Sequence, residues 1–192
     1  GLKRNCFESS HFCCQWRDTI TYVQFDPALI RSFVIMKTLL LVRHAKTAPA
    51  GPGQADHARA LEDEGVTDAG KLAHYLRKKS LIPDQILVSS ANRTQTTAHI
   101  LLTACQGHAI DVVVSEALYL ADIELLKSLI TQASDEVNTL MIVGHNPGLS
   151  ELAHHYDPDV GGMRPAQMLC VRFDIEHWTK AQAKHVVKTR LV

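Results

Sequence analysis

The sequence predicts an α/β domain in which helices cover a mostly parallel sheet. Short apolar runs alternate with segments of helical periodicity, as in successive β-α-β units. The most apolar runs, 38–42 and 139–143, lack an alternation with polar residues, which is typical of strands buried on both faces. The chain has 192 residues, of which 46% are hydrophobic, so it is long enough for one domain with a substantial core.

The expected elements follow one another from the first apolar run to the tail. Strands are expected at 38–42, 86–88, 112–114, 139–143, 168–173 and 184–187, the last two at the edges of the sheet. Helices are expected at 67–79, 92–105, 123–133 and 149–155. Thr67 is the expected cap of the first helix, after a polar loop over 48–63 that is rich in Pro and Gly.

Residues 1–35 differ from the remainder of the chain. They hold three of the five cysteines, show no sustained period, and lack the apolar stretch of a secretory signal. Because Met36 directly precedes the first strand, we expect an N-terminal extension at 1–35, either non-native or disordered, and one domain at 36–192. The extension would then come from a misassigned start or from cloning. The alternative is a short helix around 27–34 that docks on the domain.

Composition argues against several classes of protein. Lys plus Arg and Asp plus Glu both number 20, so the basic excess of a nucleic-acid-binding protein is absent. The longest apolar candidate for a membrane span, 29–42, is interrupted by Arg31 and Lys37. No pair of cysteines has the spacing of a structural zinc site. We therefore expect reduced thiols, no metal, no contact with nucleic acid or membrane, and a cytoplasmic location.

Polar residues gather at three junctions between a strand and the following helix. Arg43 and His44 follow the first strand, Arg93 lies in the segment 89–94 after the second, and His145 lies in 144–148 after the fourth. In open α/β sheets, ligands bind beyond the carboxyl ends of the strands. The sequence therefore predicts two histidines and two arginines along one edge of the sheet.

This combination of side chains suits a phosphoryl group. The guanidinium groups of Arg43 and Arg93 can fork onto its oxygens. Arg93 also lies in the first turn of a predicted helix, whose free N–H groups and dipole favour an anion. Like charge beside two arginines lowers the pKa of His44 and keeps it neutral and nucleophilic, with a backbone carbonyl expected on its second ring nitrogen. Asn146 is expected to cap the helix at its junction, with Pro147 in the first helical position.

Each of these features has an ordinary interpretation when it stands alone. An Arg-His pair after a strand is usually solvated, and the other two junctions read as common turns and caps. Only their joint placement at three strand ends indicates a site. The other nine histidines receive no role, and the adjacent pair His154 and His155 faces in two directions on a helix, which argues against a shared metal.

The motifs resemble those of the histidine phosphatase superfamily and, within it, the SixA-like phosphohistidine phosphatases. Five segments are similar in the family's order between Met36 and Phe173: Leu40–Thr47 (an Ala variant of the Arg-His-Gly motif), Asp56–Leu61 (Asp-x-x-Arg-Pro-Leu), Val88–Thr97, Glu116–Tyr119 (Glu-x-Leu-Tyr) and Val143–Leu152. Ala60 stands where the family usually has proline, so we expect a looser loop behind Arg59. Residues 1–35 have no counterpart in the family.

The resemblance implies a phosphoglycerate mutase-like fold, a three-layer α/β/α sandwich that needs neither metal nor cofactor. It implies that His44 is phosphorylated and that Arg43, Arg93 and His145 bind the phosphoryl oxygens, and we place Asn146 with them. Glu116 is the candidate general acid, both by the resemblance and by its place after the strand at 112–114. Asp56, with Arg59 in the same loop, is the second candidate.

Three functions remain open on the sequence. The first is a phosphatase that acts on phosphohistidine in proteins, which the compact chain and the open site it implies would suit. The second is a small-molecule phosphomonoesterase or a phosphoglycerate mutase-like enzyme. The third is a non-catalytic phosphate-binding module, which the intact set of Arg43, His44, Arg93 and His145 disfavours. The oligomeric state stays open.

Overall fold

The computed structural model describes residues 15–16, 19–20 and 36–192. The chain divides into two compact units, Gly1–Val34 and Ile35–Val192. In the first unit, β1 (Gln15–Trp16) pairs antiparallel with β2 (Thr19–Ile20). The helix considered at 27–34 lies outside the described residues, as do the three N-terminal cysteines, and the origin of the extension stays a prediction. Cys105 and Cys170 are free thiols.

The second unit is built on a six-stranded sheet with the order β5-β4-β6-β3-β7-β8. Its strands are β3 (Met36–Arg43), β4 (Gln85–Ser89), β5 (Asp111–Ser115), β6 (Thr139–Gly144), β7 (Met168–Asp174) and β8 (Val186–Leu191). The strands β3 to β6 run parallel, whereas β7 is antiparallel to β3 and β8 is antiparallel to β7. The mostly parallel sheet is therefore confirmed.

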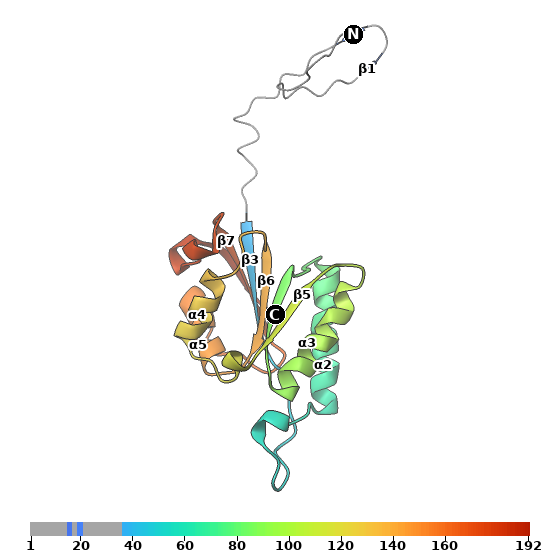
Figure 1. Ribbon diagram of the computed structural model, residues 1–192, viewed down its shortest axis with the longest axis vertical. Helices are drawn as coiled ribbons and strands as arrows, with labels where there is room; N and C mark the ends of the chain where they lie inside the picture. Colours follow the sequence, from blue (N-terminus) through green and yellow to red (C-terminus); the bar gives the residue numbers. More distant parts are fainter. Residues whose placement is uncertain (1–14, 17–18, 21–35) are drawn as a thin grey trace, which may run out of the picture. The chain divides into compact units, whose positions relative to one another are not determined.

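Helices cover both faces of this sheet, as Figure 1 shows. One layer holds α2 (Asp63–Lys78) and α3 (Asn92–Leu102), and the other holds α4 (Ile123–Thr131) and α5 (Gly148–Tyr156). Short 3₁₀ turns lie at Asp56–Ala58, Thr103–Cys105, Glu116–Leu118, Trp178–Lys180 and Ala183–His185. The three-layer α/β/α sandwich is confirmed.

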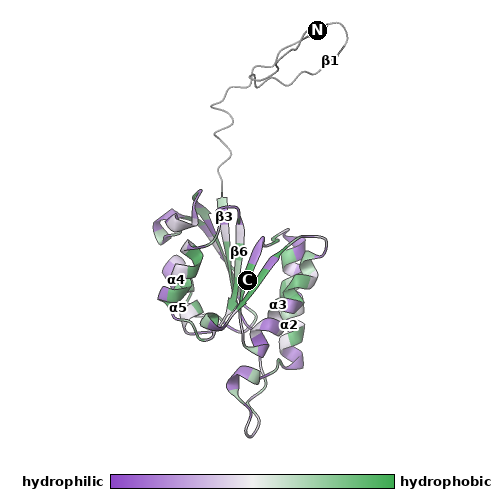
Figure 2. Cartoon of the chain, in the orientation of Figure 1, coloured by the Kyte–Doolittle hydropathy of each residue, from purple (hydrophilic) through white to green (hydrophobic). Residues whose placement is uncertain are grey.

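The central strands carry the core between the two layers. Leu39 to Val42 on β3 and Leu140 to Val143 on β6 are fully buried, and hydrophobic residues line the strands between the helices in Figure 2. Leu40 and Val42 pack with α2 and α3, whereas Leu39 and Leu41 pack with α4 and α5. This division follows from the period of two residues in a strand and explains the uninterrupted apolar runs.

The first helix begins earlier than its expected cap. Its N-cap is Glu62, and Thr67 lies inside α2, so that prediction is wrong. The Glu62 amide donates to the Lys46 carbonyl at 3.0 Å, and a Cβ at Gly65 would overlap the Lys46 backbone. Packing of the first turn against the preceding loop therefore sets the helix start, and Asp63 and Glu64 complement its dipole.

The tail strands also differ from expectation. β7 lies inside the sheet between β3 and β8, and residues 183–185 form a 3₁₀ turn before β8. The second edge of the sheet is instead β5, whose three valines are 40–52% exposed. The error arises because β7 pairs with β3 on one side, a long-range contact that periodicity does not reveal.

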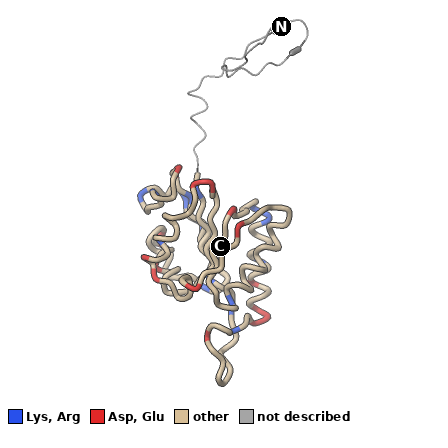
Figure 3. The backbone as a smooth tube through the Cα atoms, viewed as in Figure 1, with Lys and Arg blue, Asp and Glu red and all other residues tan. Residues whose placement is uncertain are grey.

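Charged residues of both signs are interspersed along the second unit, as Figure 3 shows. No helix among the described residues is long and apolar enough to cross a membrane.

Candidate active site

Parallel pairing brings the two predicted histidines together. In the register of β3 and β6, Arg43 lies opposite Gly144, so His44 and His145 leave neighbouring strand ends at the same level. Their ring centroids are 5.2 Å apart, with the ring planes at 58°. β4 joins the same edge through the pairing of Val88 with Val143, which brings Ser89 beside them. The expected convergence at the carboxyl ends of the strands is confirmed.

The His44 ring is held by its own backbone neighbour. Its Nδ1 lies 2.8 Å from the Ala45 carbonyl oxygen, and since a carbonyl only accepts, Nδ1 is the donor. The proton is thus fixed on Nδ1, and Nε2 keeps its lone pair. Thr97 Oγ1 in turn accepts from the Ala45 amide at 3.1 Å, which anchors this turn to α3.

The pKa of His44 is lowered to about 4, so the ring is neutral at physiological pH. Burial is the main cause, and the positive charges of Arg93, Arg43 and Arg59 add to it. The predicted direction is therefore right, although the arginines are the smaller cause.

His145 is more deeply buried, with 4% of its surface exposed. Its Nε2 lies 2.8 Å from the Ser89 hydroxyl, and its Nδ1 has no hydrogen-bond partner among the described residues. Burial, followed by the charge of Arg93, lowers the pKa of His145 to about 3. Both histidines are therefore uncharged, and each is tied to a neighbour through one ring nitrogen only.

Arg93 and Asp56 form the most highly connected part of the site. Arg93 is 3% exposed, and its guanidinium donates to the Asp56 carboxylate at 2.9 Å and to the Asp56 carbonyl at 2.7 Å. The carboxylate also accepts from Arg59 at 2.9 Å and from the Tyr119 hydroxyl at 2.8 Å. Hydrogen bonds from Tyr119 and Arg59 and the charge of Arg93 hold the pKa of Asp56 well below its usual range, so it stays ionised.

Arg59 braces this loop against the chain that follows β3. Besides Asp56, it donates to the Ala48 carbonyl at 2.8 Å and to the Thr47 hydroxyl at 2.6 Å. Three hydrogen bonds thus hold Arg59 in place. The next residue, Ala60, is the one that stands where the family usually has proline.

Arg43 and Asn146 share one backbone acceptor. Arg43 donates from NH1 to the Met163 carbonyl at 2.8 Å, and Asn146 donates from its amide to the same oxygen at 3.0 Å. Asn146 therefore does not cap the following helix; the N-cap is Pro147, and α5 begins at Gly148, so the predicted cap is wrong.

The start of α5 is fixed by a close backbone approach. A Cβ at Gly148 would overlap the carbonyl oxygen of Ala121, which leaves room for glycine only. This contact sets where the segment that carries His145 turns into the helix.

Buried polar atoms without a partner gather at this site. In the part of the chain that the structure describes, they are Arg43 Nε, His145 Nδ1 and Asn146 Oδ1. Buried polar groups are normally hydrogen-bonded, and unsatisfied ones call for an explanation such as a ligand. The three belong to residues that the sequence assigns to phosphate binding.

Glu116 lies at the rim of the site. Its side chain is 85% exposed and accepts a hydrogen bond from the Ser90 hydroxyl at 2.8 Å. The same hydroxyl lies 2.8 Å from His57 Nε2, and His57 is 4.0 Å from the Glu116 carboxylate.

Four residues at the site were missed by sequence reasoning. Tyr119 contacts both His145 and His57 edge-on, with ring centroids 5.4 Å and 5.0 Å apart, and it lies under the Arg93 guanidinium at 5.8 Å. Ser89, Ser90 and His57 complete the set. All four lie inside motifs already noted, His57 in the segment Asp56–Leu61, so their nearness to the functional residues was the available signal.

A metal centre finds no support in the geometry. No group of three or more His, Cys, Asp or Glu side chains among the described residues is close enough to hold a metal ion. This includes the pair His154 and His155.

Comparison with known proteins gives this geometry its context. The sequence profile of the histidine phosphatase superfamily (branch 1) matches residues 39–145, which is more than half of the chain. The chain belongs to the histidine phosphatase superfamily. Its fold and its membership make it a phosphatase, which sets aside the non-catalytic alternative.

Two relatives match more than half of this chain. An uncharacterized protein of Mycobacterium tuberculosis is 38% identical over 113 residues, which is 58% of this chain and 67% of that protein. An uncharacterized chloroplastic protein of Arabidopsis thaliana is 32% identical over 136 residues, 67% of this chain and 62% of that protein. Neither name states an activity.

A solved structure supplies the fold comparison. A protein of Agrobacterium tumefaciens, proposed to be the phosphohistidine phosphatase SixA, superposes with a TM-score of 0.66 and is 30% identical. The match covers 70% of this chain and 90% of that one. A mycobacterial glucosyl-3-phosphoglycerate phosphatase is 18% identical with a TM-score of 0.54, over 81% of this chain and 97% of that one, and it shares the fold alone.

Proposed function

We propose that this enzyme is a phosphohistidine phosphatase that acts on protein-borne phosphohistidine through a phosphorylated His44. The observation that carries the proposal is the His44 ring, whose Nδ1 donates to the Ala45 carbonyl and whose Nε2 is thereby left as a free nucleophile. Nε2 attacks phosphorus and forms a P–N bond as the bond to the leaving group breaks. Water then cleaves the new P–N bond, which releases inorganic phosphate and restores His44.

The surrounding donors would stabilise the charge of the transferred group. Arg93 uses two of its guanidinium nitrogens on Asp56 and keeps further N–H donors, and Arg43 Nε is unpartnered. Preorganised donors of this kind are the usual source of catalysis in phosphoryl transfer. The amide nitrogen of Asn146 uses one of its two N–H donors on the Met163 carbonyl and keeps the second for a phosphoryl oxygen, whereas its unpartnered amide oxygen can only accept.

His145 would contribute as a neutral donor. For Nδ1 to donate to a phosphoryl oxygen it must carry the ring proton, and the Ser89 hydroxyl then donates to Nε2. Ser89 Oγ lies 3.5 Å from the Ala91 amide, which donates to it and leaves its own hydrogen for His145. Ser89 would accordingly act as a positioning residue, because its hydroxyl can supply the hydrogen that this tautomer of His145 needs at Nε2.

The leaving-group proton is better assigned to Glu116 than to Asp56. Asp56 accepts hydrogen bonds from three residues, and its lowered pKa keeps it from carrying a proton. Glu116 accepts one such bond and is open to solvent, so it can exchange a proton between turnovers.

A protein-borne substrate is favoured by the open rim. The side chains of Glu116 and His57 are 85% and 40% exposed, so a phosphorylated histidine on another protein could reach the site. The similarity to the Agrobacterium tumefaciens protein supports the same substrate class. The cytoplasmic location expected from the sequence stays a prediction.

The test is turnover of two substrates at matched concentration. We expect release of phosphate from a phosphohistidine-containing protein with a kcat/KM well above that for a small phosphomonoester. A ³²P label trapped by rapid alkaline quenching should map to His44 and be absent in His44→Ala. A higher kcat/KM for the phosphomonoester would favour the small-molecule alternative, and a label on another residue would remove His44 from its role.

A further inference from the structure

A second cluster of positive charge lies away from the histidines. A pocket of about 110 Å³ opens between the end of α2 and the strands β7 and β8, and it is lined by Tyr75, Lys79, Leu81, Cys170, Arg172, Lys188, Thr189 and Arg190. Arg172 pairs with Thr38 near the start of β3, and Lys79 ends α2 before β4 begins. The pocket therefore faces the amino ends of the parallel strands, whereas the histidines lie beyond their carboxyl ends.

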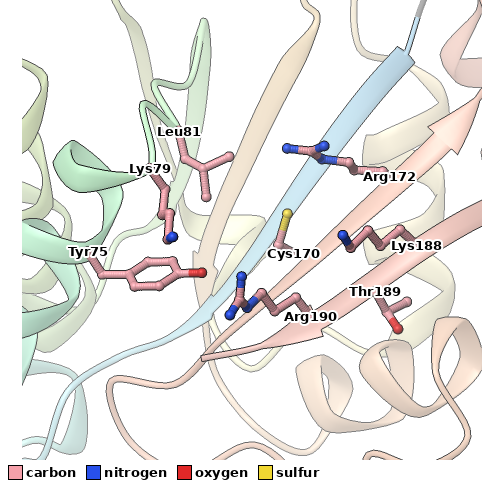
Figure 4. A pocket seen from close by; sticks show the side chains of 8 residues that line it. All are labelled: Tyr75, Lys79, Leu81, Cys170, Arg172, Lys188, Thr189 and Arg190. Atoms are coloured by element: carbon pink, nitrogen blue, oxygen red, sulfur yellow. The ribbon is translucent and has the colours of Figure 1, made fainter.

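The side chains converge on this pocket from two sides. Figure 4 shows Tyr75 and Lys79 reaching from α2 toward Arg172, Lys188 and Arg190, which come from the strands, with Cys170 between them. The Arg190 guanidinium lies 5.9 Å from the centre of the Tyr75 ring, a cation–π contact that directs it into the pocket.

The strand register itself concentrates like charge. Arg172 lies directly opposite Lys188, and Cys170 lies directly opposite Arg190. The two pairs are two residues apart along the strands, so the three cations among them lie on the same face of the sheet. Like charges placed directly opposite each other on neighbouring strands are destabilising. The arrangement therefore carries a cost in the free protein that an anion would relieve.

Nothing that lines the pocket offsets this charge. None of the lining residues is acidic, and no ion pair among the described residues involves any of the four cations. The Cys170 thiol at the floor is 7% exposed, and burial raises its pKa, so it remains uncharged at neutral pH. In a chain with no net charge, four uncompensated cations around one pocket form a distinct feature.

We propose that this pocket is a second, non-catalytic site for a small multivalent oxyanion such as a diphosphate group. Arg172, Arg190, Lys79 and Lys188 supply the charge-assisted donors, and the Tyr75 hydroxyl points into the same space (Figure 4). The small volume and the buried floor favour a compact ligand over an extended acidic peptide. The site is independent of the function proposed above.

Methylenediphosphonate is a suitable probe because its P–C–P linkage resists hydrolysis. It is titrated into the ¹⁵N-labelled full chain at low ionic strength, since exposed charges are screened by salt. Amide shifts of Cys170 and Arg190 report the pocket, and those of Gly144 and His145 report the site of the histidines. We expect the pocket amides to shift and saturate along their own binding curve.

Charge-matched variants separate the pocket from general electrostatics. Arg172→Gln/Lys188→Gln should weaken binding at the pocket by about tenfold or more, because lost charge-assisted hydrogen bonds carry that scale. Its active-site amides should respond as in the wild type, which also shows that the variant is folded. Lys78→Gln/Lys184→Gln removes the same charge from two exposed lysines outside the pocket and should change neither curve.

Three results would overturn the proposal. The pocket amides could fail to shift, or shift linearly without saturation, which is simple ion screening. They could respond equally in both double variants, which would deny a role to Arg172 and Lys188. They could respond to oligoglutamate and not to methylenediphosphonate, which would make this face a docking surface for an acidic protein.

Discussion

The two cationic regions of the enzyme differ in how their charges are held. At the carboxyl edge of the sheet, Arg93 is 3% exposed and bonded to Asp56, and Arg43 is bonded to the Met163 carbonyl. Around the pocket, Arg172 and Lys188 are exposed and take part in no ion pair among the described residues. Held charges meet a transition state without reorganisation, whereas free ones must be ordered by the ligand. This difference is what we expect if the first region is catalytic and the second binds a ligand, as proposed above.

The largest expected effect comes from removing the buried guanidinium of the first region. Arg93→Ala should lower kcat by about two to three orders of magnitude, the scale for losing one preorganised donor at a developing charge. Arg172→Ala, an equal loss of charge in the other region, should leave kcat unchanged. Initial rates at saturating substrate measure both.

A loss below tenfold for Arg93→Ala would mean that its guanidinium does not face the phosphoryl group. A comparable loss for Arg172→Ala would mean that the two regions are coupled. Circular dichroism of both variants checks that they are folded.

The sequence predicted the first region far better than the second. Arg43, His44, Arg93 and His145 follow buried strands, and parallel pairing brings such positions to one edge by rule. Ser89 and Tyr119 were not predicted, because their roles depend on side-chain contacts between residues that are distant in the sequence. Arg172 and Lys188 were not predicted as a cluster, because only the antiparallel register of β7 and β8 places them opposite each other.

The same limit applies to the elements. Buried strands were found from their apolar runs, because burial on both faces leaves a strong signal. The cap of α2 was misplaced by five residues, at Thr67 in place of Glu62, since contact of the first turn with the Lys46 backbone decides where the helix starts. Asn146 was misread as a cap because its amide is used by the Met163 carbonyl, a distant partner.

A smaller effect concerns the carboxylates at the catalytic edge, where Asp56 is held and Glu116 is free. Glu116→Gln should slow an alkyl phosphomonoester by about a hundredfold, the lower end of the range for general-acid catalysis, because the group is exposed. It should slow phosphohistidine hydrolysis far less, since imidazole can be protonated beforehand near its own pKa of about 6.5. Single-turnover rates on both substrates measure the difference.

Asp56→Asn is the matched variant. It loosens Arg93, Arg59 and Tyr119 together, so it should slow both substrates to a similar degree. A differential effect seen only in Asp56→Asn would transfer the acid role to Asp56. An equal effect of Glu116→Gln on both substrates would leave Glu116 with an ordering role only.

The smallest expected effect is the pH dependence, which should differ between the activity and the binding of an anion in the pocket. The nucleophile must be neutral, and the pKa of His44 is about 4 and that of His145 about 3. The histidines stay neutral from pH 7 to 5, so kcat/KM should be nearly level over that range. As the pH falls through 4 they become protonated, and kcat/KM should fall. No histidine or carboxylate lines the pocket, so methylenediphosphonate binding there, after correction for the ionisation of the ligand itself, should show no step at the pH of the activity loss.

The same shifts make stability depend on pH with a definite sign. The unfolded chain binds a proton at each histidine near pH 6.5, whereas the folded chain does so only near 4 and 3. The unfolded state therefore holds more protons between these values, and the free energy of unfolding should fall as the pH falls from 6.5 toward 4. The melting temperature should follow it, and His44→Ala should flatten the slope, whereas His99→Ala, at an exposed position on α3, should not. An unchanged slope in His44→Ala would mean that His44 is not buried as a neutral ring, and its place as a free nucleophile would fall with it.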